Sequence, residues 1–324
     1  MKKILIIRFS SIGDIVLTTP VIRAIRKQLD AEVHFLTKEA FAPVLSANPY
    51  IHRLHLIKKD VGEVSARLRR ERFDFIVDLH HNLRSAQVKA AVRRPSASFR
   101  KLNIEKWMLV NMGINRLPDV HIVDRYFDTV SALGVKNDLQ GLDYFIPASD
   151  EVALSSLPQG FAEGYTGFVI GAKFMTKQLP AEKIASVIGR LEGPVIMLGG
   201  SEDKAKGETV TALLRPGQAQ RVYNACGKYN LNQSASLVRQ AQRIITHDTG
   251  LMHIAAAFKK DITSVWGNTV PAFGMYPYLP GRGSKIIEVK GLSCRPCSKL
   301  GHAQCPKGHF RCMMEINEAE IARS

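Results

Sequence analysis

The residues best suited to chemistry lie in one short stretch, Asp248-Thr249-Gly250-Leu251-Met252-His253. An apolar run precedes it and the helix-forming segment Ile254–Phe258 follows it, so the expected order is strand, turn and helix. Thr249 and Gly250 then lie at a helix start, where unpaired backbone N–H groups and the positive end of the dipole suit a phosphate. Two plainer interpretations stay open: Asp248 as a helix cap and His253 as an ordinary core residue.

A second loop of this kind follows the first predicted strand, Lys3–Arg8. Its sequence is Phe9-Ser10-Ser11-Ile12-Gly13-Asp14, and a helical pattern continues from Ile15 to Leu29. Gly13 permits a tight turn, and Asp14 lies at the helix start as either a helix cap or a general base. The loop is not G-x-G-x-x-G, and no Walker A sequence occurs in the chain, so neither nucleotide-binding fingerprint is present.

Charged residues follow two further predicted strands in the second half. Lys173 and Lys177 come after one strand, and they could neutralise a diphosphate or simply be solvated loop lysines. Glu202 and Asp203 begin a helix after another strand, where a carboxylate can cap the helix or bind a ribose diol.

Short strands alternate with helices along the chain, which predicts two doubly wound α/β domains with parallel sheets. A Ser-, Pro- and Gly-containing stretch from Pro147 to Gly164 has no clear periodicity, and we place the boundary there, with domains 1–155 and 156–324. The expected strands are Lys3–Arg8, Glu32–Thr37, Arg53–Ile57, Phe73–Asp78, Gly167–Gly171, Pro194–Leu198, Gln220–Tyr223, Arg243–Thr246 and Asp261–Val265. The expected helices are Ile15–Leu29, Ala40–Ala47, Gly62–Arg72, His121–Leu133, Pro180–Leu191, Ser201–Leu214, Leu231–Arg239 and Gly250–Phe258.

The 324 residues carry a net charge of +16, and this strong positive charge favours an anionic partner. Hydrophobic residues make up 45% of the chain, which supports packed cores. Aromatic residues make up only 7% and do not alternate with basic ones, so we do not expect nucleic acid as a partner. No uncharged apolar run is long enough for a transmembrane helix, and the start does not resemble a signal peptide, so we expect a cytoplasmic protein.

Four of the five cysteines lie near the end of the chain, with the spacing C-x2-C-x7-C-x6-C. The first pair is a zinc half-site, whereas the second pair is wider than usual. A structural zinc ion at Cys294, Cys297, Cys305 and Cys312 and a set of ordinary thiols are both open interpretations.

Three segments together resemble bacterial glycosyltransferase family 9, the ADP-heptose:lipopolysaccharide heptosyltransferases. They are Arg8–Asp14, Lys177–Pro180 and Asp248–Ala255, in the family's order and over nearly the whole chain. The resemblance implies the GT-B architecture, with two Rossmann-like domains facing across a cleft, the acceptor on the N-terminal domain and the donor on the C-terminal one. It also implies an inverting transfer of a heptose from ADP-heptose to the inner core of lipopolysaccharide, with no metal or other cofactor required.

The same resemblance assigns roles residue by residue. Asp14 matches the catalytic base, and Lys177 matches the lysine that contacts the donor diphosphate, although Leu179 replaces the family's tryptophan. The remaining donor-side candidates are Lys173, Glu202, Asp203, Asp248, Thr249, Gly250 and His253. The acceptor-side candidates are Ser11, Gly13, Arg84 and Arg125.

The implied partners are an ADP-sugar and an anionic, lipid-linked saccharide, with peripheral contact to the anionic inner membrane through the basic surface. The sequence can be compared with three rival hypotheses. The sequence hardly distinguishes the ADP-heptose enzyme from a glycosyltransferase of the same fold that uses another nucleotide sugar or acceptor. A non-enzymatic polyanion binder follows from charge alone, and an aspartic protease would need a second Asp-Thr-Gly triplet in a β-rich chain, which this chain lacks.

Overall fold

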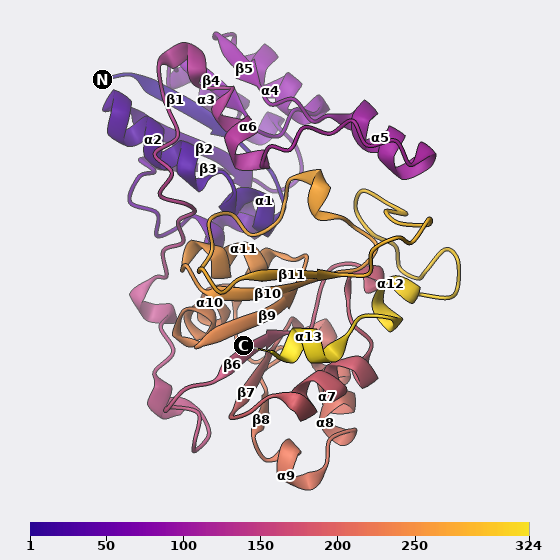
Figure 1. Cartoon of the computed structure of the whole chain (residues 1–324). Helices are drawn as coiled ribbons and strands as arrows, with labels where there is room; N and C mark the ends of the chain where they lie inside the picture. Colours follow the sequence, from indigo (N-terminus) through magenta and orange to yellow (C-terminus); the bar gives the residue numbers. More distant parts are fainter. Residues whose placement is uncertain (324) are drawn as a thin grey trace. The chain divides into compact units, whose positions relative to one another are not determined.

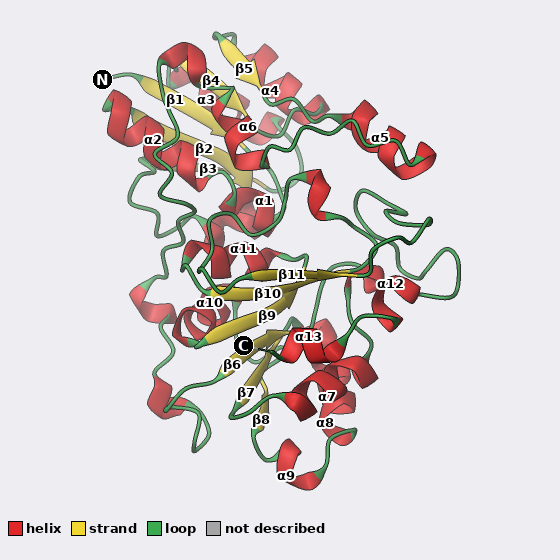
Figure 2. Cartoon of the chain, viewed as in Figure 1, coloured by secondary structure: helices red, strands yellow, loops and turns green. Residues whose placement is uncertain are grey.

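The computed structural model describes residues 1–323, which form two compact α/β units (Figures 1 and 2). Unit 1 comprises Met1–Lys101 and Val120–Pro147. Unit 2 comprises Leu102–Asp119 and the chain from Ala148 onward. The domain boundary expected after residue 155 lies a few residues beyond the observed division after Pro147. Residues 102–119 belong to unit 2, although the residues before and after them in the sequence belong to unit 1.

Unit 1 is built on a five-stranded sheet with the order β3-β2-β1-β4-β5, and every strand pair is parallel. The strands are β1 (Lys3–Ile7), β2 (Glu32–Lys38), β3 (Arg53–Ile57), β4 (Phe75–Asp78) and β5 (Ser96–Ser98). The helices are α1 (Ile12–Val16), α2 (Thr19–Leu29), α3 (Gly62–Arg70), α4 (Leu83–Val92), α6 (Ile122–Phe127) and the 3-10 helices η1 (Glu39–Val44) and η2 (Ser131–Leu133).

The core of unit 1 explains why β1 is apolar at every position: helices cover both faces of the sheet. Leu5 and Ile7 of β1 pack in the same cluster as Leu68 of α3 and Val88 of α4. Side chains alternate along a strand, so the residues between them point to the opposite face, where α2 packs on β2 and against α6.

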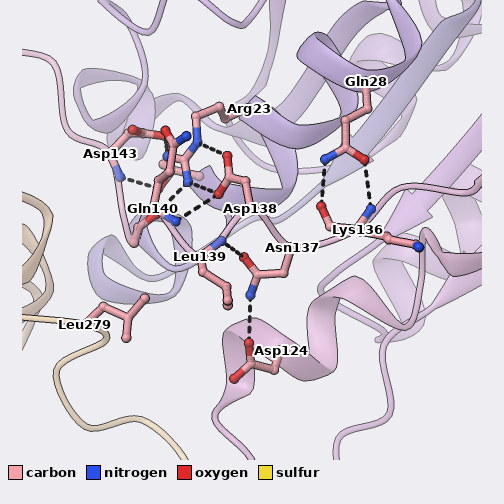
Figure 3. Close-up of polar contacts among 12 residues, drawn as sticks. Arg23, Gln28, Asp124, Lys136, Asn137, Asp138, Leu139, Gln140, Asp143 and Leu279 are labelled. Atoms are coloured by element: carbon pink, nitrogen blue, oxygen red, sulfur yellow. Dashed lines mark hydrogen bonds and ion pairs between the residues drawn. The ribbon is translucent and has the colours of Figure 1, made fainter.

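Arg23 of α2 fixes the last segment of unit 1 to the helix (Figure 3). Its guanidinium is 2% exposed, donates from Nε to Asp138 Oδ2 at 2.8 Å, and forms an ion pair with Asp143. A third bond reaches the carbonyl oxygen of Gly141 at 2.8 Å. A buried guanidinium with two carboxylates is a charge-assisted clamp, and it orders a segment that has no helix or strand of its own.

Unit 2 is built on a six-stranded parallel sheet with the order β11-β10-β9-β6-β7-β8. The strands are β6 (Thr166–Val169), β7 (Val195–Leu198), β8 (Val222–Asn224), β9 (Arg243–His247), β10 (Asp261–Trp266) and β11 (Lys285–Glu288). The α-helices are α5 (Asn103–Met112), α7 (Ala181–Arg190), α8 (Lys204–Ala212), α9 (Pro216–Ala219), α10 (Leu231–Gln240), α11 (Gly250–Ala257), α12 (Arg311–Met314) and α13 (Glu318–Ala322). The 3-10 helices are η3 (Ala148–Asp150), η4 (Leu154–Ser156), η5 (Met175–Lys177), η6 (Ser201–Asp203) and η7 (Pro271–Phe273).

Helices α7, α8 and α13 cover one face of this sheet, and α10 and α11 lie on the other (Figure 1). The first face contains Phe168, Ile184, Val210 and Ile321 in one buried cluster. The last helix is therefore part of the core of unit 2. No helix within residues 1–323 is long and apolar enough to cross a membrane.

Several predicted elements differ in detail from the structure. The expected helix Ile15–Leu29 is two helices, α1 and α2. At the break, the hydroxyls of Thr18 and Thr19 donate to nearby carbonyl oxygens, and Pro20 lies in the first turn of the second helix. The expected helix Ala40–Ala47 is the 3-10 helix η1, which contains Pro43. The expected helix His121–Leu133 is α6 followed by η2, and strands β5 and β11 were not predicted.

Candidate active site

Each sheet has one point at which the strand order reverses direction, and the predicted site loops lie there. In unit 1 the reversal is between β1 and β4, and in unit 2 it is between β6 and β9. Ligands of open α/β sheets bind beyond the carboxyl ends of the strands at such a point. The loop with Asp14 follows β1, the loop with Lys177 follows β6, and the loop with Asp248 follows β9.

In unit 1, Asp14 lies in the first turn of α1 and forms an ion pair with Arg8 at the end of β1. The distance from Arg8 Nη2 to Asp14 Oδ1 is 2.6 Å. The other carboxylate oxygen, Oδ2, accepts hydrogen bonds from the backbone N–H of Ser11 at 3.1 Å and from its hydroxyl at 2.7 Å. Asp14 is therefore the N3 residue of a capping box with the N-cap Ser11, and the same contacts fix its carboxylate at the carboxyl end of β1.

Arg8 is buried and holds several parts of unit 1 together. Its Nη1 donates to the carbonyl oxygen of Leu79 at 2.5 Å and to the hydroxyl of Tyr126 at 3.2 Å. Its Nε donates to the carbonyl oxygen of Ser10 at 2.8 Å. One side chain thus positions the base candidate Asp14 relative to the loops after β1 and β4.

The loop after β4 contributes His80, which packs with its ring edge-on to Phe9 at a centroid distance of 5.2 Å. Burial and the positive charge of Arg8 lower the pKa of His80 to about 4, so the ring is neutral at neutral pH. Its Nδ1 is buried and has no hydrogen-bond partner among residues 1–323. A neutral imidazole beside a carboxylate can accept or donate a hydrogen bond to a sugar hydroxyl.

Asp78 anchors the backbone of the same loop. Its Oδ1 accepts from the N–H of His81 at 2.7 Å, and its Oδ2 accepts from the Ser85 hydroxyl at 2.8 Å. Burial acts to raise the pKa of Asp78, but these hydrogen bonds and Lys89, 3.2 Å away, hold it below its usual value. Asp78 is thus a structural residue of this loop.

The four acceptor-side candidates are placed differently. Ser11 and Gly13 lie with Asp14 at the start of α1, and Arg84 is half-buried in the first turn of α4. Arg125 is buried, donates to the carbonyl oxygen of Arg100 at 2.8 Å and has its guanidinium carbon 5.0 Å from the Phe99 ring centre. The structure therefore gives Arg125 internal contacts, and acceptor binding by these four residues stays a prediction.

In unit 2, Lys177 and Asp248 form an ion pair across the strand-order reversal. Lys177 Nζ is 2.5 Å from Asp248 Oδ2, and the hydroxyl of Thr269 donates to the same oxygen at 2.9 Å. The three residues come from the loops after β6, β9 and β10. They bring a half-buried ammonium group to the carboxyl ends of the central strands, where a phosphate would bind.

Helix α11 starts beside this pair in sequence, with Thr249 as its N-cap and Gly250 as its first residue. The eight-residue helix directs its unpaired N–H groups toward the carboxyl end of β9. His253 lies one turn further on and is buried, at 2% exposure. The predicted helix start at Thr249 and Gly250 is confirmed, while phosphate binding there stays a prediction.

Asp203, at the end of η6, and Lys206, in α8, follow β7 and lie close to the segment after β6. Asp203 Oδ2 accepts from the N–H of Gly200 at 2.9 Å, and a Cβ on Gly171 would lie 1.9 Å from that oxygen. Burial, reinforced by the nearby charge of Glu202, raises the pKa of Asp203. Burial lowers the pKa of Lys206 to about 8, and its Nζ donates to the side chain of Gln178 at 2.8 Å.

Three other predicted positions lie in these same loops. Glu202 is exposed, and Lys173 is exposed with its Nζ 5.6 Å from the Phe174 ring centre. Leu179, which replaces the tryptophan of the family pattern, is fully buried, and its N–H donates to Nε2 of His247 at 3.0 Å. The buried leucine therefore fills the core position beneath the lysine loop.

The C-terminal cysteines are free thiols. Cys294 Sγ is 3.9 Å from Nε2 of His309, while Cys312 is buried. In the part of the chain that the structure describes, no three potential ligand atoms of this tail lie within 4.8 Å of one another. A zinc ion held by Cys294, Cys297, Cys305 and Cys312 stays a prediction.

Sequence reasoning did not assign a role to Arg8, Thr269 or Asn268. Asn268 is 1% exposed, and neither atom of its amide has a hydrogen-bond partner among residues 1–323. Such a buried amide is the kind of group that a ligand hydroxyl or phosphate satisfies. The available signal was position at the carboxyl edge of a sheet: Arg8 directly follows β1, and Asn268 and Thr269 lie in the loop just after β10.

Known proteins of one family are similar to this chain. The sequence model of glycosyltransferase family 9 (heptosyltransferase) matches residues 61–306. Lipooligosaccharide heptosyltransferase 2 of Haemophilus ducreyi is 24% identical, over 99% of this chain and 97% of its own length. Lipopolysaccharide heptosyltransferase 3 of Escherichia coli is 27% identical, over 79% of this chain and 81% of its own.

The fold has a solved counterpart as well. The structure of E. coli ADP-heptose lps heptosyltransferase II superposes with a TM-score of 0.73 at 22% identity, covering 99% of this chain and 96% of that one. The GT-B fold expected from the sequence is thereby confirmed. With three quarters of its length matched by the family model, the chain belongs to glycosyltransferase family 9 and is a glycosyltransferase.

Proposed function

We propose that this enzyme transfers a heptose from ADP-heptose to the inner core of lipopolysaccharide, with inversion at the anomeric carbon and without a catalytic metal ion. The relatives named above are heptosyltransferases, and one solved structure of this fold is an ADP-heptose enzyme. The observation that carries the proposal is the Lys177–Asp248 ion pair at the strand-order reversal of unit 2, with the start of α11 next in sequence.

The donor half of the mechanism belongs to unit 2. The diphosphate replaces Asp248 as the partner of the Lys177 ammonium group, while the N–H groups of Thr249 and Gly250 bind phosphate oxygens. Positive charge and fixed N–H donors at the leaving group take the place of a metal ion. Asp203, held against Gly171, or its neighbour Glu202 binds the adenosine ribose, and Lys173 and His253 contact the phosphates and the sugar.

The acceptor half belongs to unit 1. The Asp14 carboxylate takes the proton of the acceptor hydroxyl, and the acceptor oxygen forms a bond to the anomeric carbon of the heptose. The bond from that carbon to the phosphate oxygen breaks at the same time, and ADP leaves with the electron pair. A single displacement of this kind inverts the configuration. Ser11, Gly13, Arg84 and Arg125 are the proposed acceptor contacts.

Thermal unfolding with ADP, UDP, GDP and CMP tests the donor assignment. We expect ADP alone to raise the melting temperature, because only a ligand of the folded state stabilises it. The Lys177→Ala variant should lose most of that increase. A shift with UDP or GDP in place of ADP would keep the fold but overturn the donor, and no shift with any nucleotide would contradict the proposed donor site.

The chain also carries a surface suited to peripheral contact with an anionic membrane, as part of the same proposal. In and beside α5, Ile104, Trp107 and Met112 are 74%, 57% and 55% exposed, and none of the helix's residues is buried. Arg100 and Lys101 precede the helix and Arg116 follows it. Exposed apolar side chains with a tryptophan, flanked by basic residues, are typical of segments that lie in a membrane interface.

Sedimentation with phosphatidylglycerol vesicles tests this contact. Replacement of Ile104 and Trp107 by serine should reduce vesicle binding at least about tenfold, because the variant has less apolar surface to bury in the membrane interface. Leu213→Ser removes an equally exposed apolar side chain elsewhere in unit 2 and should not change binding. Equal binding of all three proteins would exclude α5 as the contact surface.

A further inference from the structure

A cluster of histidines and glutamates lies at the edge of the unit 1 sheet opposite the active-site loops. Glu32 begins β2, His34 is the third residue of β2, and His52 directly precedes β3. His55 is the third residue of β3, and Glu71 follows α3. Because parallel strands begin at the same edge, these residues gather at the amino-terminal end of the sheet. The reaction proposed above does not use them.

Three of these residues converge with ligand atoms. Side chains of Glu32 and His34 lie on one face of β2 because they are two residues apart. Nε2 of His34 is 3.7 Å from Oε2 of Glu32, and the rings of His34 and His52 have centroids 5.5 Å apart. One ligand atom from each of Glu32, His34 and His52 lies within 4.8 Å of the others. Ligand atoms around a tetrahedral zinc ion are roughly 3.3 Å apart, given bonds of about 2.0–2.2 Å, so small side-chain movements suffice.

The buried nitrogen of His34 is unsatisfied as the chain stands. His34 is 1% exposed, and its Nε2 has no hydrogen-bond partner among residues 1–323. A buried polar atom without a partner costs free energy, and in native proteins it usually has water or an ion beside it. This nitrogen faces Glu32, which is the arrangement that a bound cation would satisfy.

The other nitrogen of His34 is already held in the way that metal-binding histidines require. Nδ1 of His34 is 2.9 Å from Nε2 of His55, which is itself fully buried. The Phe73 ring packs edge-on against the His34 ring, with centroids 5.1 Å apart. If Nδ1–H donates to His55, the lone pair of His34 lies on Nε2, and a partner on the second ring nitrogen fixes both tautomer and orientation.

Lys3 occupies the carboxylate side of the cluster. Its Nζ is 3.3 Å from Oε2 of Glu32 and 3.7 Å from Oε2 of Glu71. Glu71 has a second cationic partner, because Arg53 Nη1 lies 2.6 Å from its Oε1. Glu32 can therefore exchange Lys3 for a metal ion while Glu71 stays paired with Arg53.

We propose that Glu32, His34 and His52 bind one divalent transition-metal ion of the zinc class, with His55 as the residue that positions His34. Two imidazole nitrogens and one carboxylate form a ligand set that zinc accepts, with a water molecule completing the coordination. The ion links the start of β2 to the residue before β3. Its role is structural, because the active-site loops leave the opposite ends of the strands.

Cobalt(II) and zinc(II) titration of the tag-free, chelator-treated full-length protein tests the site. Imidazole and carboxylate ligands give cobalt d–d bands without the thiolate-to-cobalt charge-transfer band that the C-terminal cysteines would produce. His52→Ala and Glu32→Gln should weaken this thiolate-free binding by at least about tenfold. His52 is exposed, so its removal should leave the fold intact, as zinc-free thermal unfolding can verify. Unchanged cobalt affinity in His52→Ala would overturn the proposal, as would binding that shows only the thiolate band.

A second kind of variant should strengthen metal binding, whereas the variants above should weaken it. Lys3→Met removes the cation that competes for Glu32 and should tighten zinc binding several-fold. Lys2→Met makes the same charge change at the neighbouring exposed lysine and should have a much smaller effect, because only general electrostatics act there. Equal effects of the two variants would contradict the site. Zinc should also raise the melting temperature of the wild type but not of His52→Ala.

Discussion

The two strand-order reversals hold their charged residues in opposite ways. In unit 1, Arg8 and Asp14 belong to one strand end and the helix that follows, so the ion pair is local in sequence. In unit 2, Lys177 and Asp248 come from loops 71 residues apart, and the ion pair joins them across the reversal. A local pair, fixed also by Ser11, can hold a base in place with or without ligand. In the proposed mechanism, the pair between two loops exchanges partners when the diphosphate binds. We therefore expect the same kind of ion pair to position a residue in unit 1 and to take part in binding in unit 2.

We expect the largest effect on catalysis from a substitution in the Arg8–Asp14 pair. Asp14→Asn keeps the shape of the side chain but removes its ability to accept the acceptor proton, so we expect kcat to fall by about 10²–10⁴-fold. The KM for ADP-heptose should change little, since the proposed donor site lies in unit 2. Steady-state kinetics checks this, with circular dichroism as the control for folding. Full activity in a folded Asp14→Asn protein would remove Asp14 from the mechanism.

For the Lys177–Asp248 pair, we expect a substitution both to weaken donor binding and to lower the reaction rate. Lys177→Ala should lower kcat by about 10²–10³-fold, because an ammonium group no longer stabilises the leaving diphosphate. Lys173→Ala is the matched control: Lys173 lies in the same loop but is exposed, and its Nζ lies over the Phe174 ring. We expect a clearly smaller loss there. Equal losses from both lysines would mean that loop charge, and not the Asp248 partner, decides donor binding.

The close approach of Asp203 to Gly171 allows a purely steric test, with a smaller expected effect. A methyl group at Gly171 would lie 1.9 Å from Asp203 Oδ2, so Gly171→Ala must displace that carboxylate. We expect a loss of about 1–3 kcal/mol in unfolding free energy, together with weaker ADP binding by calorimetry. Gly217→Ala, where a Cβ would meet nothing within 4 Å, should leave both unchanged. Undiminished ADP affinity in Gly171→Ala would exclude Asp203 as a donor contact.

The last expected effect is a pH dependence of stability, to which both units contribute. Burial and Arg8 lower the pKa of His80 to about 4, and burial and Lys206 lower that of His247 to about 3. An unfolded histidine titrates near 6.5, so below that pH the unfolded chain binds protons that the folded chain does not. Stability should thus be full above about pH 6.5 and fall as the pH decreases toward 4 and then 3.

Urea unfolding at several pH values between 7 and 4 checks this slope. His80→Gln and His247→Gln should each make the decrease shallower than in the wild type, because each removes one group whose pKa changes on unfolding. An identical slope in the wild type and in both variants would contradict the assignment of neutral, buried rings.

The sequence allowed much of this arrangement to be predicted, because strands of parallel sheets are buried on both faces and therefore read as apolar runs. Arg53–Ile57 was predicted with the observed bounds, and the turn before Gly250 was placed correctly. Strand β11 was missed, since Lys285 and Ile286 at a sheet edge are partly exposed and carry no apolar run. The start of α1 at Ile12 was missed, because the predicted helix began at Ile15. The contacts at this start, Asp14 with Arg8 and Ser11, are polar bonds that hydrophobic periodicity does not report.

Contacts between residues far apart in the sequence could not be predicted. Lys177 and Asp248 were each assigned to phosphate binding, but nothing in their spacing indicates that they contact one another. The family resemblance matched Arg125 to the acceptor side, but it did not indicate that its guanidinium contacts Phe99 and the Arg100 carbonyl group. Side-chain direction of this kind depends on packing across the unit and not on the local pattern.

The most direct test of the proposed function is the mass of the acceptor after reaction. Purified enzyme is incubated with a heptose-free lipopolysaccharide inner-core acceptor and, in parallel, with ADP-heptose or with UDP- and GDP-sugars. We predict that the acceptor gains the mass of one heptose with ADP-heptose alone, and that Asp14→Asn gives no gain in the same time. A gain only with a UDP- or GDP-sugar, or undiminished transfer by Asp14→Asn, would contradict the account.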